Sequence, residues 1–336
     1  MKEYDLGVLE QYDMEVRSTR RIRGAFFCDT NQGIILLKET TLSDRRACLL
    51  YAILNRLEEN SGLKVDTPVF TKTGELICTA KDGGRYMCKK WFAGRECDVA
   101  QRSDIIRACR QLAVIHLSLG AQEAESFREE KEEILSTGHL PWDEVRRHNR
   151  ELKKVRAFIR NRVSKNEFEQ LFLTSFETMY DLAEKVAARL ESDGCRALYR
   201  RNIEKNTLIH GDYNYHNVLM LADTVAVTNF EHMRRDIQAQ DLCYFLRKVM
   251  EKHQWDEEMG KRMLDAYQSV RPLQRGELDY IGLNLAYPEK FWKTASTYYH
   301  SNKAWIPEKS VEKLQLSVRQ AKEKLDFLEH IFTLNL

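Results

Sequence analysis

The segment from His210 to Asn217, His-Gly-Asp-Tyr-Asn-Tyr-His-Asn, constrains the fold of this chain more than any other feature. It places a His-x-Asp triplet at a fixed distance before an Asn, and the apolar run Val218-Leu-Met-Leu221 follows at once. These residue types at these spacings would occur by chance only about once in several hundred chains of this length. The pattern predicts a loop between a helical region and a β-hairpin.

The side chains at the two ends of this loop indicate its chemistry. An Asp at the start can accept a proton from a hydroxyl group, and an Asn one loop-length later can turn its carbonyl oxygen toward Mg²⁺. This is the skeleton of a phosphotransferase catalytic loop. The candidates are Asp212 and His210 for catalysis and Asn217 for the metal and the nucleotide. The alternative is an ordinary turn in which Asp212 caps the loop.

The first part of the chain, 1–95, predicts a small lobe rich in antiparallel strands. Residues 21–38 and 75–92 each contain two runs of β-favouring residues, and the residues between the two runs are of types that favour turns. Each range therefore indicates a hairpin. A helix is expected between them, because Ser43 offers an N-cap, apolar residues follow at helical spacing, and Gly62 ends the pattern.

The remainder, 96–336, is mainly helical and is interrupted by the catalytic loop at 208–221 and by a hairpin whose strands are expected at 217–221 and 224–230. The charged stretch at about 122–165 has few apolar residues, so we expect exposed helices of a solvated insertion around the Leu140-Pro141 break. A binding tail is the alternative. The expected fold class is α+β, with a small antiparallel-sheet N-lobe on a large helical C-lobe.

Composition excludes several classes of partner. The chain has 336 residues, and its 53 Lys and Arg nearly balance its 51 Asp and Glu, so no overall charge favours nucleic acid or an anionic membrane. Its apolar stretches are too short to span a bilayer, and its first residues do not resemble a signal peptide. The eight cysteines form no C-x-x-C pair, which favours reduced core thiols over zinc ligands or disulfides. We expect a soluble, cytoplasmic protein.

The motif His-Gly-Asp-x-x-x-x-Asn resembles that of the aminoglycoside and choline phosphotransferases. Residues 208–217, Trp91-Phe-Ala-Gly-Arg-Glu-Cys-Asp98 and 291–307 are similar to the CotS-type spore coat proteins within that group, and the likeness covers nearly the whole chain. The resemblance implies a protein-kinase-like bilobal fold, with a nucleotide-binding lobe at 1–95. It also implies ATP and Mg²⁺ as cofactors, and a spore coat location after synthesis in the cytoplasm.

The resemblance assigns further residues and exposes departures from the family pattern. Lys38 ends a strand and matches the lysine that holds nucleotide phosphates, and Gly24 belongs to the loop expected to cover them. The helix that should supply an acid to Lys38 offers only Asp44. Where the family has a metal-binding Asp, this chain has Asn229, an uncharged oxygen donor. Glu231, expected on the same strand face, is the candidate to compensate.

Two hypotheses follow. The first is an ATP-dependent kinase acting on a hydroxyl group of a small molecule or saccharide, with Asp212 as base, Asn217 with Asn229 or Glu231 on Mg²⁺, and Lys38 on the phosphates. The second is a catalytically silent pseudokinase that is a structural or docking component of the spore coat, with other coat proteins as partners. Asn229 favours the second hypothesis, and the intact loop favours the first.

Overall fold

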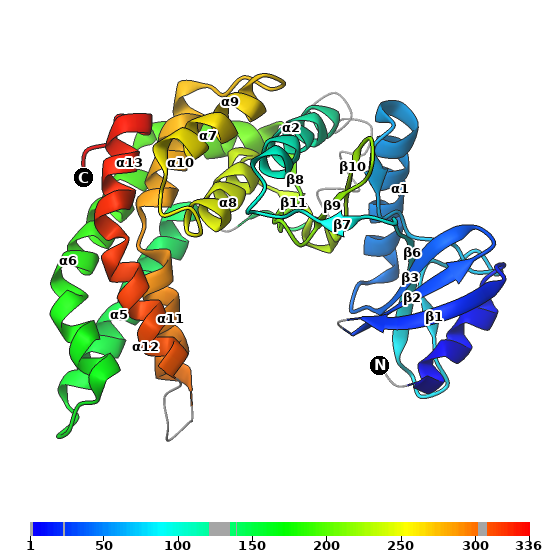
Figure 1. Ribbon diagram of the computed structural model, residues 1–336, viewed down its shortest axis with the longest axis horizontal. Helices are drawn as coiled ribbons and strands as arrows, with labels where there is room; N and C mark the ends of the chain where they lie inside the picture. The colour runs from blue at the N-terminus through cyan, green and yellow to red at the C-terminus, as the bar shows by residue number, and fades with distance from the viewer. Residues whose placement is uncertain (1–2, 23, 121–134, 139, 302–307) are drawn as a thin grey trace.

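The computed structural model describes residues 3–22, 24–120, 135–138, 140–301 and 308–336. Strands and one long helix gather at one end of the molecule, long helices form the other end, and short strands lie between them (Figure 1). The elements in chain order are η1 (Glu3–Gln11), β1 (Val16–Ile22), β2 (Ala25–Thr30), β3 (Gly33–Glu39), α1 (Asp44–Ser61), β4 (Lys64–Val65), β5 (Cys78–Thr79), β6 (Arg85–Lys90), β7 (Arg95–Glu96), α2 (Arg102–Ser118), α5 (Pro141–Arg160), α6 (Glu167–Leu190), α7 (Asp193–Glu204), β8 (Leu208–Ile209), β9 (Val218–Met220), β10 (Val225–Val227), η2 (Phe230–His232), β11 (Arg234–Arg235), α8 (Ala239–Met250), α9 (Glu257–Gln268), α10 (Arg275–Ala286), α11 (Glu289–His300), α12 (Glu308–Arg319) and α13 (Ala321–Phe332).

The N-terminal sheet has the strand order β1-β2-β3-β6-β5, and all its neighbouring strands are antiparallel. The residues at 21–28, which we expected in one strand, are divided between β1 and β2. Gly24, with φ of 82°, is in the turn between these strands, in a left-handed conformation that a side chain would disfavour. One face of the sheet packs against η1 through a cluster that includes Val8, Leu9 and Tyr12.

Helix α1 begins and ends where its sequence predicts. The side chain of Ser43 accepts a hydrogen bond from the backbone N–H of Arg46, and Gly62 ends the helix in a left-handed conformation with φ of 62°. The apolar residues at helical spacing are buried in the main core: Leu49, Leu50, Ile53, Leu54 and Leu57. Helix α1 therefore joins the N-terminal part to the core of the helical part.

A second sheet, with the order β4-β10-β9-β7, connects the two parts of the molecule. Strand β4 comes from the N-terminal part and pairs in parallel with β10, while β9 and β10 form the antiparallel hairpin expected after the catalytic loop. In Figure 1, β7, β9 and β10 lie between the N-terminal sheet and the helices. The catalytic loop, which runs directly into β9, is thereby placed beside the junction.

The helical part corrects the expectation of a solvated insertion at 122–165. Helix α5 is amphipathic, and its residues Leu152, Val155 and Ile159 are fully buried against α6 and α11. Within α5, the charged residues lie on the side opposite these buried residues. The part of the expected insertion at 121–134 lies outside the described residues.

Burial agrees with the expectation for the cysteines, since seven of the eight are buried thiols and only Cys48 is exposed. In the described part of the chain, no helix combines the length and the apolar character needed to cross a membrane.

Candidate active site

His210 fixes the start of the catalytic loop from inside the core. It is fully buried, its Nε2 lies 2.9 Å from the carbonyl oxygen of Thr228, and its Nδ1 accepts the backbone N–H of Asp212 at 3.1 Å. Burial lowers the pKa of His210. A neutral imidazole with this tautomer donates to Thr228 and accepts from Asp212, so His210 shapes the loop.

Asp241, at the start of α8, holds the same loop from its other side. Its carboxylate accepts the backbone N–H groups of His210 at 2.7 Å and Gly211 at 2.9 Å, and it lies 3.2 Å from Nε2 of His116. Burial alone would raise the pKa of Asp241, but these hydrogen bonds and the neighbouring histidines lower it overall. Gly211 has φ of 83°, and a side chain there would collide with the carbonyl of His232.

Asp212 is positioned by two amide side chains of its own loop. Nδ2 of Asn214 lies 2.9 Å from Oδ1 of Asp212, and Nδ2 of Asn217 lies 2.9 Å from Oδ2. Within the described ranges, no Lys or Arg forms a salt bridge with this carboxylate. Asp212 is thus oriented by neutral donors.

Lys38 reaches the same site from β3. Its Nζ lies 3.3 Å from Oδ1 of Asn229 and 3.2 Å from Oε2 of Glu231. Asp44, the acid that α1 offers, instead forms a salt bridge with Arg85 at 2.8 Å. The carboxylate partner of Lys38 therefore comes from η2, after the catalytic loop, and not from α1.

Behind Lys38 lies a fully buried lysine, Lys89 of β6. Its ammonium group contacts Glu231 and lies 3.3 Å from Oδ2 of Asp66, and the side chains of Lys89 and Asp66 are both 1% exposed. Burial alone would lower the pKa of Lys89, but these two carboxylates raise it above its ordinary value. The same lysines, Lys89 and Lys38, lower the pKa of Glu231 against the effect of its burial. Glu231 is thus a carboxylate shared by two lysines.

Asn229 does not lie on a strand, so the expected shared strand face with Glu231 is wrong. Strand β10 ends at Val227, Asn229 has a left-handed backbone with φ of 73°, and Glu231 belongs to η2. The backbone N–H of Asn229 donates to Oδ2 of Asp66 at 2.8 Å, which holds this turn. Its Nδ2 lies 3.4 Å from Oδ1 of Asn217. The structure nevertheless brings Asn217, Asn229, Glu231 and Lys38 together.

Gly24 is placed beside this group by strand register. Ala25 pairs with Lys38 across β2 and β3, so the turn that contains Gly24 is next to the end of β3 at which Lys38 lies. The catalytic candidates, the lysine, the amides and the glycine turn therefore lie around one junction between the N-terminal sheet and the catalytic loop.

A cavity of about 500 Å³ lies between α5, α8 and α10, and Asp212 is not among its described lining residues. Tyr244 lines it, and burial raises the pKa of Tyr244, which the adjacent carboxylate of Asp212 raises further. The other described residues that line the cavity come from α5, α8, α10 and the segments beside them: Ser136, Thr137, Gly138, Pro141, Glu144, Val145, His148, Arg234, Asp236, Gln240, Cys243, Arg247, Tyr280, Asn284, Tyr287 and Glu289.

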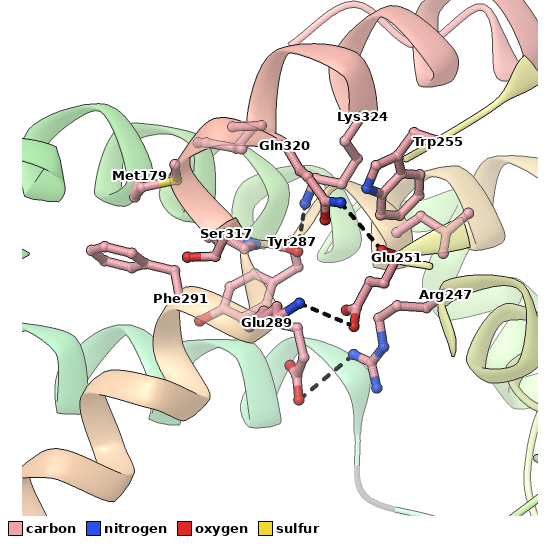
Figure 2. Close-up of a pocket in the computed structure, with 15 residues that line it drawn as sticks. Met179, Arg247, Glu251, Trp255, Tyr287, Glu289, Phe291, Ser317, Gln320 and Lys324 are labelled. Carbon is pink, nitrogen blue, oxygen red and sulfur yellow. Dashed lines mark hydrogen bonds and ion pairs between the residues drawn. The ribbon is translucent and has the colours of Figure 1, made fainter. Parts of the chain in front are cut away.

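A second, much smaller cavity of about 30 Å³ lies behind the first, and Arg247, Tyr287 and Glu289 line both. Figure 2 shows it, with Lys324 directed at the end of α10. Nζ of Lys324 donates to the carbonyl oxygens of Ala286 at 2.9 Å and Tyr287 at 3.0 Å, and burial lowers its pKa to about 8. A volume of this size holds about one water molecule. Lys324 therefore stabilises the C-terminal end of α10.

Comparison with known protein families matches residues 7–331 to the family described as "Spore coat putative kinase YutH". The chain belongs to this family. It is also 24% identical over 332 residues to "Spore coat protein S" of Bacillus subtilis (strain 168), and the match covers 94% of this chain and 89% of that protein. The resemblance to spore coat proteins that the sequence indicated is confirmed.

Solved structures confirm the kinase-like α+β fold of this YutH-family chain. An aminoglycoside phosphotransferase from Alicyclobacillus acidocaldarius is similar with a TM-score of 0.82 at 18% identity, over 96% of this chain and 94% of that one. A spectinomycin phosphotransferase solved with ADP and spectinomycin has a TM-score of 0.63 at 13% identity, over 94% and 96%. An amicoumacin kinase solved with AMP-PNP and Ca²⁺ has a TM-score of 0.63 at 13% identity, over 96% and 94%.

The oxygen donors at the candidate site of this YutH-family chain fit a metal ion that binds together with nucleotide phosphates. Among the described residues, no group of three or more His, Cys, Asp or Glu is arranged to hold a metal ion alone. The amide oxygens of Asn217 and Asn229 are hard donors of the kind that Mg²⁺ accepts, and Mg²⁺ usually completes its shell with phosphates and water. Glu231 contributes less, because two lysines already contact its carboxylate.

Sequence reasoning missed Lys89 and Asp66, which hold Glu231 and the Asn229 turn. The sequence signal for Lys89 was its position in the strand Arg85–Lys90, directly after the apolar run Tyr-Met-Cys. A lysine at such a position is buried only if it is paired with a carboxylate. The sequence alone does not show which carboxylate that is.

Proposed function

We propose that this chain transfers the γ-phosphate of ATP to a hydroxyl group of a small molecule. The observation that carries the proposal is the placement of Asp212, which Asn214 and Asn217 hold at 2.9 Å and which interacts with Tyr244, a residue that lines a cavity large enough for an acceptor. Oriented carboxylates of this kind act as bases toward an acceptor hydroxyl in phosphoryl transfer.

In this mechanism the acceptor oxygen forms a bond to the γ-phosphorus while the bond between that phosphorus and the β–γ bridging oxygen breaks. ADP leaves, and Asp212 takes the hydroxyl proton. Lys38 binds the phosphates, the Gly24 turn covers them, and Asn217 with Asn229 would hold Mg²⁺. A Mg²⁺ ion at this position neutralises charge on the β- and γ-phosphates.

Membership of the YutH family and the likeness to spore coat protein S support a role in the spore coat, following synthesis in the cytoplasm. The partners in this proposal are the nucleotide, a small-molecule or saccharide acceptor, and other coat proteins. The phosphotransferase neighbours that were solved with ADP or AMP-PNP support the assignment of a nucleotide.

The test is ADP formation from ATP and Mg²⁺ by the purified chain and by Asp212→Asn. We expect the variant to be slower by at least about 100-fold, the usual loss when a general base is removed. Asp223→Asn is the matched control, because Asp223 is exposed in the turn after β9. Equal rates for the wild type and Asp212→Asn would contradict the proposal.

One observation favours a second candidate function, a catalytically silent component of the coat. Asn229 stands where the resemblance places a metal-binding Asp, and the carboxylate of Glu231, two residues later, is paired with Lys38 and Lys89. This candidate predicts that Asp212→Asn leaves coat assembly and ADP formation unchanged.

A further inference from the structure

We propose that the cavity beside Asp212 binds an uncharged, polyhydroxylated acceptor of the saccharide or polyol class, and that it disfavours cationic aminocyclitols and amino alcohols. The inference rests on the proposed function for the place of the acceptor, and it adds the chemical class. It is carried by the charges and hydrogen-bonding groups that line the cavity.

The cavity lies next to the proposed catalytic carboxylate. Tyr244, one turn into α8, interacts with Asp212 and lines the cavity, so one side chain separates a molecule in the cavity from Asp212. The volume of about 500 Å³ lies within the range of small-molecule sites and accommodates one or two sugar rings.

Each carboxylate among the described residues that line the cavity already has a basic neighbour. Asp236 is 3.1 Å from Nε of Arg234, Glu289 is 3.6 Å from Arg247, and Glu144 is 3.8 Å from Arg147. A cationic acceptor loses its hydration on entry and needs unpaired carboxylates to compensate. The described lining therefore offers such a cation no unpaired carboxylate of its own.

The lining instead offers neutral groups with unused hydrogen-bonding capacity. Gln240 accepts from Tyr280 through Oε1 at 2.8 Å, and Asn284 donates to the carbonyl of Tyr280 at 2.8 Å. Among the residues that the structure describes, Nε2 of Gln240 and Oδ1 of Asn284 have no partner. A donor and an acceptor of this kind match a pair of hydroxyl groups.

His148 adds a buried neutral group to the same wall. Its ring stacks on Trp292 with 3.4 Å between ring centroids, its side chain is 4% exposed, and its Nδ1 has no partner within the described residues. Nε2 lies 3.3 Å from a guanidinium nitrogen of Arg147, which can only donate, so Nδ1 carries the hydrogen. Burial lowers the pKa of His148 to about 4, and this N–H remains a neutral donor at neutral pH.

The test is direct binding to the full chain without nucleotide or Mg²⁺, measured by ligand-observed NMR. The probes are N-acetylglucosamine and trehalose as neutral compounds, and choline and kanamycin as cations. We expect the neutral probes to bind at millimolar concentrations, and neither cation to displace them. Tighter binding of a cation, or no binding of either neutral probe at tens of millimolar, would overturn the inference.

Gln240→Glu tests the same point from within the cavity. The variant keeps the acceptor for Tyr280, removes the free amide donor and adds an unpaired carboxylate. We expect neutral binding to weaken about three- to tenfold, which is the effect of one lost hydrogen bond, and kanamycin binding to appear. Gln268→Glu on α9 is the matched control. Identical binding by the two variants would contradict the assignment of the cavity.

The result does not depend on turnover. Sugar binding without ADP formation would support the proposed class of ligand and contradict the proposed phosphotransfer. ADP formation without sugar binding would support phosphotransfer and contradict the proposed class of ligand.

Discussion

The carboxylate of Glu231 lies 3.2 Å from Nζ of Lys38, and it is held from behind by the buried ammonium group of Lys89. The lysine proposed to bind nucleotide phosphates therefore already has an anionic partner in the unliganded chain. A nucleotide must compete with Glu231 for Lys38, while Lys89 can keep Glu231 neutralised during the exchange. The following predictions test this arrangement and its consequences.

Replacing Lys38 with Ala should weaken ATP binding and leave the fold nearly unchanged. The side chain of Lys38 is 36% exposed and Glu231 retains Lys89, so we expect a loss of less than about 1 kcal/mol of stability. Loss of a charge-assisted contact to phosphate should raise the Kd for ATP by about tenfold or more, measured by calorimetry. Lys64→Ala, at an exposed position on β4, is the control. An unchanged Kd for Lys38→Ala would place the phosphates elsewhere.

Replacing Lys89 with Met should destabilise the whole chain. The change leaves Asp66 and Glu231 as neighbouring buried carboxylates without their shared cation, and breaking a buried pair of this kind costs about 3–5 kcal/mol. The free energy of unfolding in urea measures the loss. Lys90→Met is the matched control, because Lys90 forms an exposed pair with Glu58 at 2.6 Å. Equal losses for the two variants would show that the buried network is not structural.

Replacing Asn229 with Asp should strengthen Mg²⁺ binding in the presence of ATP. The new carboxylate would stand beside Oδ1 of Asn217 and add the charge that the amide lacks. We expect the Mg²⁺ concentration for half-maximal ADP formation to fall by about tenfold, since a charged ligand contributes on the order of 1–2 kcal/mol more than a neutral one. Asn206→Asp, at another left-handed Asn, is the control. An unchanged Mg²⁺ dependence would exclude Asn229 from the metal site.

Acid should destabilise this protein partly through His148. Burial, together with the neighbouring Arg147, lowers its pKa from 6.5 to about 4 against the opposite effect of Glu151. Between these two values the unfolded chain binds a proton that the folded chain does not, so stability falls as the pH falls from 6.5 toward 4. In His148→Gln, the urea midpoint should depend less on pH over this range. The same slope in both proteins would contradict the assignment.

The sequence predicts those parts of the site that local chemistry determines. The loop from His210 to Asn217 and the N-cap at Ser43 each depend on residues a few positions apart, and the structure forms both. Asp241 braces the same loop by accepting two of its backbone N–H groups.

The ion pairs around Lys38 could not be predicted, because they join residues distant in the chain. Lys89 and Glu231 are 142 positions apart. The left-handed backbone of Asn229 ended the predicted strand early and changed the face on which Glu231 lies. The many charged residues of α5 made its apolar face hard to predict from the sequence, because that face is defined by its packing against a neighbouring helix. In each case tertiary contacts override the local pattern.

The measurement that tests the central claim most directly is the thermal stability of the purified chain during titration with ATP, with and without Mg²⁺. Binding to the native state raises Tm by mass action. If Lys38, Asn217 and Asn229 form a live nucleotide site, millimolar ATP should raise Tm in the wild type, more with Mg²⁺ than without it, and less in Lys38→Ala. No rise at millimolar ATP would contradict the phosphotransferase proposal and favour the silent coat component.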